Sequence, residues 1–214
     1  MNKARRILVN VVLGAVTCLF CVGLSSPLMG TSASPTVQSS LTPSNAAPFQ
    51  RTVERHLAQN LQNAESAIVA QGMTGSTMTR YVAVMTKEEV VPSTPSTFAF
   101  GAAGAVLMGD RLIIRGDFSN LASPLRDFAT DPVDPPNPNI TSGIHIHQGD
   151  VTVNGPFQYA LNVDLGNNET TGRFSGEYTL TGEQLQALSN GMLYVDIHTA
   201  QNRGGELRGI LQPY

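Results

Sequence analysis

The sequence is poor in cysteine, and both of its cysteines lie in one apolar stretch near the start. Cys18 and Cys21 are the only two among 214 residues. If that stretch is removed as a leader, the mature chain holds no thiol, which excludes disulfides, cysteine nucleophiles and thiolate metal ligands. A metal site in the mature protein would then use histidine, carboxylate or carbonyl groups.

An excess of positive charge and the common hydrolase motifs are lacking as well. The formal net charge is −3, so a basic groove for nucleic acid is not expected. Neither G-x-S-x-G nor H-E-x-x-H occurs, and the carboxylates are scattered rather than paired for glycosidase chemistry. Asp127, Asp131 and Asp134 lack the dense spacing of a calcium loop. We therefore predict that the protein is not an enzyme.

The first 48 residues are typical of a leader followed by a linker. A basic start precedes the apolar run 7–24 and small residues up to Ala33, which predicts a secretory signal peptide over 1–33. An uncleaved anchor helix is the alternative, because the run is close to the lower length of a membrane span. Residues 34–48 are rich in Ser, Thr and Pro and are predicted to be a flexible linker. The predicted localisation is secreted, periplasmic or otherwise extracytoplasmic, without a membrane contact beyond the signal segment.

Two patterns of apolar residues divide the rest of the chain. Over 49–72 they recur at helical spacing, which predicts an amphipathic helix that docks on the following domain or offers its face to a partner, with His56 on its surface. Over 77–214 the period becomes two, which predicts about seven short strands, including a hairpin that turns at Asp110 and one strand within 155–166. The fold class is therefore all-β, an antiparallel β-sandwich or barrel with one short inserted helix.

Three of the four histidines fall on the polar faces of predicted strands. Side chains alternate along a strand, so His145 and His147 lie opposite the two isoleucines of the segment GIHIHQG, and His198 lies opposite the aliphatic face of its own strand. Imidazoles two residues apart are about 7 Å apart at Cα, and their tips can reach one ion at about 2.0–2.1 Å. His145, His147 and His198 are thus candidate ligands of copper or zinc.

Asp196, Glu206 and Arg208 are predicted to lie on the same polar face. They come from the last two strands, which are joined by a tight turn and should pair. In a metal site, Asp196 or Glu206 would accept a hydrogen bond from an imidazole and so orient it. The alternative needs no metal: Arg208 pairs with Asp196 or Glu206, and the histidines are ordinary polar residues of a sheet face.

The segments GIHIHQGD, GEYTLTGEQLQAL and GMLYVDIHTAQNRGGELRGIL together resemble the CHRD domain, a module named after chordin. The resemblance runs from about Arg80 to Tyr214, with Asp196 where the family often has asparagine and with a long loop inserted before the HIH segment. It implies a β-rich extracellular module without an established enzymatic activity. His145, His147, His198, Glu206 and Arg208 stand at positions of the family pattern.

A fainter resemblance links HIHQGD to a strand of copper/zinc superoxide dismutase, so the expected Greek-key domain is immunoglobulin-like or superoxide-dismutase-like. That enzyme needs more histidines and a disulfide, so its activity is not expected here. Three functions are weighed: a secreted, non-catalytic binding or structural module with an unidentified protein or surface partner, a copper- or zinc-binding protein, and a metal-dependent enzyme. We favour the first, with a histidine metal site as its possible addition.

Overall fold

The computed structural model describes residues 48–72 and 77–214. The predicted signal peptide, 1–33, and the predicted linker, apart from its last residue, lie outside the described residues. In the described part of the chain, no helix combines the length and the apolar character that crossing a membrane requires. Strands dominate this part, and the two α-helices stand at the start of the domain and between two late strands.

The elements follow one another in the order given by this list: α2 (Pro48–Ala70), β1 (Met78–Met85), the 3-10 helix η1 (Lys87–Glu89), β2 (Phe100–Met108), β3 (Arg111–Ser119), β4 (Ile144–Gln148), β5 (Phe157–Ala160), β6 (Asn162–Leu165), β7 (Gly172–Thr179), α3 (Gly182–Ser189), β8 (Leu193–Ile197), β9 (Leu207–Ile210) and β10 (Gln212–Pro213). The hairpin predicted around Asp110 is confirmed, since Met108 pairs with Arg111. The short inserted helix is also present as α3, and Thr181 and Gln184 form a reciprocal capping box at its start.

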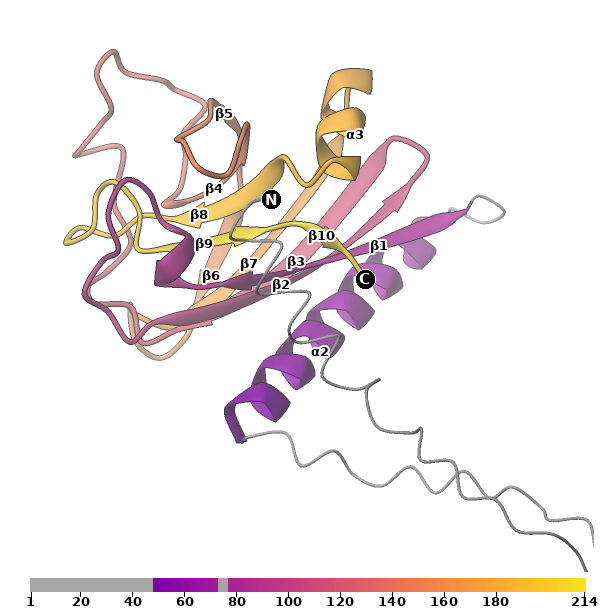
Figure 1. Ribbon diagram of the computed structural model, residues 1–214, viewed down its shortest axis with the longest axis horizontal. Helices are drawn as coiled ribbons and strands as arrows, with labels where there is room; N and C mark the ends of the chain where they lie inside the picture. Colours follow the sequence, from indigo (N-terminus) through magenta and orange to yellow (C-terminus); the bar gives the residue numbers. More distant parts are fainter. Residues whose placement is uncertain (1–47, 73–76) are drawn as a thin grey trace, which may run out of the picture. The chain divides into compact units, whose positions relative to one another are not determined.

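The strands form two antiparallel sheets, which confirms the predicted all-β fold class. The larger sheet has the order β10-β1-β2-β3-β7-β6, and the smaller sheet has the order β5-β4-β8-β9. Their apolar faces meet in one core of buried aliphatic and aromatic side chains. In Figure 1 the small sheet lies over one face of the large sheet, while α2 runs along the other face.

The segment predicted as one strand within 155–166 is in fact two strands in different sheets. β5 pairs with β4 in the small sheet, whereas β6 pairs with β7 in the large sheet. Leu161 stands between them, is 1% exposed, and donates its N–H to the carbonyl of Ile144. Alternation along the sequence identifies which side chains face the core, but strands of both sheets of a sandwich show the same alternation. The sequence therefore does not reveal the point at which the chain passes from the small sheet to the large one.

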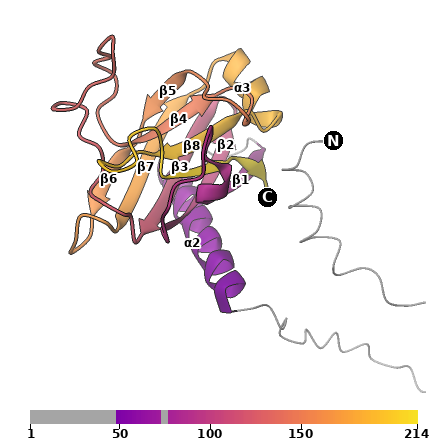
Figure 2. The ribbon, with the colours of Figure 1, turned by 60° about the vertical axis from the view of Figure 1, so that its left-hand side comes forward.

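Helix α2 packs on the outer face of β2 and β3, as Figure 2 also shows. Its buried residues Leu61, Ala64 and Ile68 form a second apolar cluster with side chains of the large sheet. The Gly/Ala-rich composition of β2 permits this close approach, because a Cβ on Gly104 would lie 2.2 Å from the backbone nitrogen of Leu61. The predicted amphipathic helix is therefore present, and it docks on the domain.

One face of the small sheet packs in the core, and this determines which side chains lie on its other face. Ile144, Ile146, Val195 and Ile197 are fully buried against the large sheet. Because side chains alternate along a strand, the residues between them point away from that core. His145 and its neighbours in β4 and β8 thus lie on the outer side of the small sheet, as predicted.

Candidate metal centre

Two neighbouring strands position the three histidines. β4 pairs with β8 in an antiparallel register that places His145 opposite Asp196 and His147 opposite Tyr194. His198 directly follows the end of β8, and its N–H donates to the carbonyl of Gly143, just before β4. The HIH strand is therefore a direct neighbour of β8, and this pairing brings side chains more than 50 residues apart to one place.

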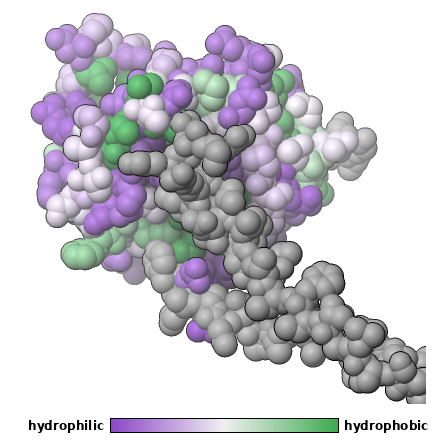
Figure 3. All heavy atoms as spheres, in the orientation of Figure 1, coloured by the Kyte–Doolittle hydropathy of each residue, from purple (hydrophilic) through white to green (hydrophobic). Residues whose placement is uncertain are grey.

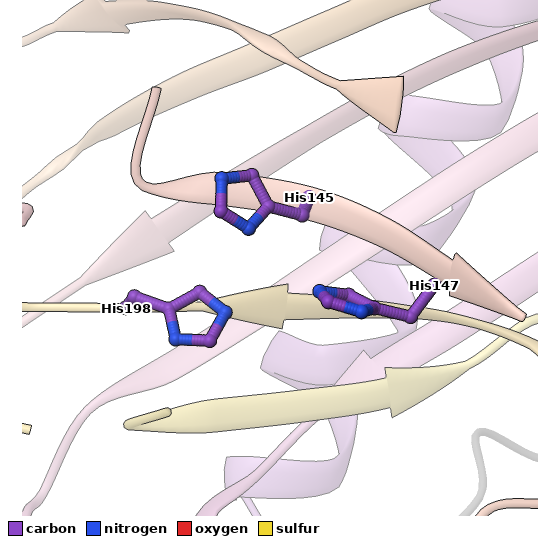
Figure 4. Close-up of side chains that lie close together, drawn as sticks. All are labelled: His145, His147 and His198. Atoms are coloured by element: carbon purple, nitrogen blue, oxygen red, sulfur yellow. The ribbon is translucent and has the colours of Figure 1, made fainter. Parts of the chain in front are cut away.

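The three rings face one another on this side of the sheet (Figure 4). The ring centroids of His145 and His198 are 5.0 Å apart, those of His145 and His147 are 5.7 Å apart, and those of His147 and His198 are 6.0 Å apart. One ring nitrogen from each residue lies within 4.8 Å of the others. Metal–nitrogen bonds of about 2.0–2.1 Å would need these nitrogens about 3.3–3.6 Å apart. Small side-chain rotations that move the nitrogens together by about 1 Å would therefore complete the site.

Hydrogen bonds to backbone carbonyls fix the tautomer of each ring. The Nδ1–H of His147 donates to the carbonyl of Gly155 at 3.0 Å, and the Nδ1–H of His198 donates to the carbonyl of Arg203 at 3.1 Å. In His145 the Nε2–H donates to the carbonyl of Ser142 at 2.6 Å. A carbonyl only accepts, so each neutral ring keeps its lone pair on the other nitrogen. The available ligand atoms are Nδ1 of His145 and Nε2 of His147 and His198.

Burial keeps these rings neutral. His145 is 2% exposed and His198 is 9% exposed. Desolvation, together with repulsion from the neighbouring His198, lowers the pKa of His145 to about 3. Desolvation and repulsion from His147 lower the pKa of His198 to about 4, and desolvation also lowers the pKa of His147. At neutral pH the site therefore holds three uncharged imidazoles, the form that binds metal ions.

Two of the ligand nitrogens have no hydrogen-bond partner within the described protein. Nε2 of His147 and Nε2 of His198 are both buried without one. Buried polar atoms without partners are uncommon in folded proteins and call for an explanation such as a bound ion or water. Here both atoms point toward the same space between the rings (Figure 4).

Aromatic side chains enclose the histidines, which sequence reasoning did not predict. The ring of Phe128 lies 5.1 Å from that of His145 and 6.1 Å from that of His198. The ring of Phe157 lies 5.3 Å from that of His145 and 6.3 Å from that of His147. Phe128 belongs to the long loop before β4, and its only signal in the sequence was an aromatic residue in an otherwise polar segment. The outer side of the small sheet is therefore a second buried layer and not an open polar surface.

Asp196 and Arg208 form a buried ion pair beside the site. Both guanidinium–carboxylate hydrogen bonds measure 2.7 Å, and the Arg208 side chain is 1% exposed. Arg208 also donates to Oδ1 of Asn154 at 2.8 Å and lies 4.2 Å over the ring of Tyr194. The Oη of Tyr194 in turn accepts from the N–H of Gly155, whose carbonyl holds His147. Arg208 thus positions the loop that orients His147.

Glu206 lies in a separate hydrogen-bond network. Its buried carboxylate accepts from the hydroxyls of Thr97 and Thr199, the N–H of Ala122 and the side-chain amide of Asn202. The expectation that Asp196 or Glu206 orients an imidazole is not met, because backbone carbonyls take that role. Glu206 instead fixes the loop that follows His198. The alternation of side chains along the strands placed both acids on the correct side of the sheet, but it gave no information about the loops that cover that side.

The fourth histidine lies elsewhere. His56 is on α2, and its Nδ1 is 2.9 Å from a carboxylate oxygen of Asp117 on β3. The predicted surface residue therefore contributes to the contact between helix and sheet. Its distance from the triad in the fold makes it a suitable control for experiments on the other three.

Comparison with known protein families matches residues 81–211 to the CHRD domain. The match runs from within β1 to just beyond the end of β9 and includes all three clustered histidines and both Asp196 and Arg208. No curated protein and no solved structure matches the chain. Since the matched region is more than half of the sequence, the chain belongs to the CHRD domain family.

Proposed function

We propose that the protein is a non-catalytic, extracytoplasmic module that binds a copper or zinc ion through His145, His147 and His198. The observation that carries this proposal is the pair of buried, unpartnered Nε2 atoms that face the third imidazole. Leaving a buried polar atom unsatisfied costs about 1–3 kcal/mol. A metal ion between the rings would use these lone pairs together.

The type of ligand selects the class of ion. Imidazole nitrogens suit copper, zinc and similar transition metals, whereas calcium and magnesium take oxygen ligands. The clustered ligands are three histidines, and the carboxylate of Asp196, which stands opposite His145 in the sheet, is held by Arg208. Copper or zinc is therefore the expected occupant.

The surroundings of the site support a non-catalytic role. A catalytic metal needs an open coordination position that a substrate or water can reach. Here the Nε2 atoms of His147 and His198 are buried, and the rings of Phe128 and Phe157 flank His145. The membership of the CHRD family and the apolar N-terminal segment support a location outside the cytoplasm.

A protein or surface partner remains part of this proposal. Among the described residues visible in Figure 3, hydrophilic side chains predominate and hydrophobic ones form small separate groups. The part of the surface seen in that view offers little for a broad apolar interface. The histidine site is therefore the stronger of the two functional features, and a partner would act alongside it.

Metal binding is tested with the purified protein, stripped of metal and titrated with copper and with zinc. We expect one ion per chain, a rise in thermal stability on loading, and loss of both in His145→Ala, His147→Ala and His198→Ala. His56→Ala is the matched control, because it removes the one histidine outside the cluster, and it should bind as the unaltered protein does. If the unaltered protein binds neither ion, or if the His56 variant loses binding equally, the proposal fails.

A further inference from the structure

We infer that the histidine site is selective for monovalent copper, which it holds with three imidazoles and no fourth ligand. This inference rests on the proposed metal binding and specifies the oxidation state and the coordination number. It follows from three features of the site: the charge of its ligands, the enclosure of its ligand atoms and the hydrogen bonds that hold its rings.

The ligand set supplies no negative charge. Each imidazole donates one ring N–H to a backbone carbonyl and offers the lone pair of its other nitrogen, so all three ligands are neutral. A bound ion therefore keeps its full formal charge inside a largely buried site. The cost of burying an ion by the Born relation rises with the square of its charge, so a divalent ion costs about four times as much as a monovalent one. An uncompensated site of this kind favours Cu(I) over Cu(II) and Zn(II).

The charged groups around the rings do not offset a second positive charge. Asp196 is paired with Arg208 through two hydrogen bonds of 2.7 Å. The guanidinium of Arg126 lies 4.4 Å over the ring of Phe128, which itself lies next to His145 and His198. The Asp196 carboxylate is thus already paired with a cation, and Arg126 adds a further positive charge near the rings. The surroundings therefore offset a second positive charge on the ion poorly.

Enclosure limits the coordination number. Zinc bound by three histidines normally takes a water molecule as its fourth ligand. The Nε2 atoms of His147 and His198 are buried, and the rings of Phe128 and Phe157 lie next to that of His145. The apolar rings of Phe128 and Phe157 beside the histidines offer no oxygen donor to a bound ion. Cu(I) is satisfied by three nitrogen ligands and does not need that water.

The carbonyl acceptors restrict the ligand set. Each ring donates its N–H to a backbone carbonyl, those of Ser142, Gly155 and Arg203. The small adjustment that brings the three nitrogens onto one ion is compatible with these hydrogen bonds, but a larger rotation toward another geometry would break them. Cu(II) prefers a tetragonal arrangement with further nitrogen or oxygen donors. A fixed set of three nitrogens therefore penalises oxidation of the bound ion.

The test measures the reduction potential of copper in the whole protein. We expect the protein to bind Cu(I) at least about a hundredfold more tightly than Cu(II). At 59 mV per tenfold, this ratio raises the reduction potential of the bound copper about 120 mV above that of the aqueous couple. X-ray absorption of the copper-loaded, reduced protein should show three nitrogen ligands and no oxygen ligand. Phe128→Asp, which places a carboxylate beside the rings, should lower the selectivity by about tenfold or more.

The outcomes separate this inference from the proposed function. If neither copper nor zinc binds, metal binding itself is wrong. If zinc or Cu(II) binds through the three histidines with a water ligand, and the potential does not exceed that of the aqueous couple, metal binding stands and selectivity for Cu(I) is refuted. Phe128→Leu preserves an apolar cover without a charge and should retain the selectivity, so a loss in both Phe128 variants would also refute the charge argument.

Discussion

Replacing Arg208 with methionine should destabilise the domain strongly, because it leaves the carboxylate of Asp196 buried without its partner. Arg208 is 1% exposed, and its two hydrogen bonds to Asp196 measure 2.7 Å. Removing one member of a buried ion pair costs about 3–5 kcal/mol. Arg208→Met retains most of the apolar volume, so we attribute the expected loss to the stranded charge and not to a cavity.

The double variant Asp196→Asn, Arg208→Met isolates that charge. With the carboxylate neutralised, the loss should shrink to about 1–3 kcal/mol, which is the cost of the unsatisfied polar groups that remain. Arg208→Lys keeps the positive charge but not the two-point geometry, and it should fall between these values. Urea denaturation followed by circular dichroism measures all three free energies of unfolding.

The exposed pair of Arg111 and Glu177 is the matched control on the same fold. Its side chains are 34% and 33% exposed, and its N–O distance is 3.1 Å. Exposed pairs contribute about 0–1 kcal/mol, so Arg111→Met should change the stability little. If Arg208→Met costs no more than Arg111→Met, or if the double variant is as unstable as the single one, the assignment of a buried ion pair is refuted.

Three further perturbations test other parts of the structure. In the metal-free protein, acid should destabilise the fold, because the pKa of His145 is about 3 and that of His198 about 4, against about 6.5 in the unfolded chain. The unfolded state then binds more protons, so the free energy of unfolding should fall by about 3 kcal/mol per histidine between about pH 6.5 and 4. Urea titrations measure this fall, and a flat pH profile would contradict the burial of the two histidines. Gly104→Val should displace α2 from the sheet, since a Cβ there meets the backbone of Leu61 at 2.2 Å, and limited proteolysis should then cleave α2; continued protection of the helix would argue against this packing. Glu206→Gln should cost about 1–3 kcal/mol in thermal unfolding, because the amide cannot accept from all of the donors that surround the carboxylate, and an unchanged melting temperature would count against that network.

The core faces were predictable from the sequence because a strand has only two sides. Once Ile144 and Ile146 were placed inside, the side of His145 and His147 was determined, and the structure confirms it. The tight turn between the last strands likewise predicted the pairing that places Asp196 opposite Arg208. Local spacing was sufficient in these cases because each inference concerned residues on the same or adjacent strands.

What covers the small sheet was not predictable in the same way. Phe128 comes from a loop with no periodic pattern, and the carbonyls of Ser142, Gly155 and Arg203 are backbone groups that any residue provides. The sequence therefore identified the candidate ligands but described their environment as an exposed polar face. The error concerned loops, whose paths depend on long-range contacts and not on the alternation of side chains.

That difference in environment decides between the two sequence-based interpretations of the histidines. An exposed cluster would keep pKa values near the ordinary value and would satisfy its free nitrogens with water, as polar residues of a sheet face do. Here burial lowers all three pKa values, and backbone carbonyls hold each ring so that its lone pair faces the others. If only polar residues were needed at these positions, burying them with two nitrogens unpartnered would cost free energy without a return. If the site binds a metal ion, the bound ion offsets the cost of the unpartnered nitrogens. The arrangement is therefore best explained as a metal site whose ligands are positioned before the ion arrives.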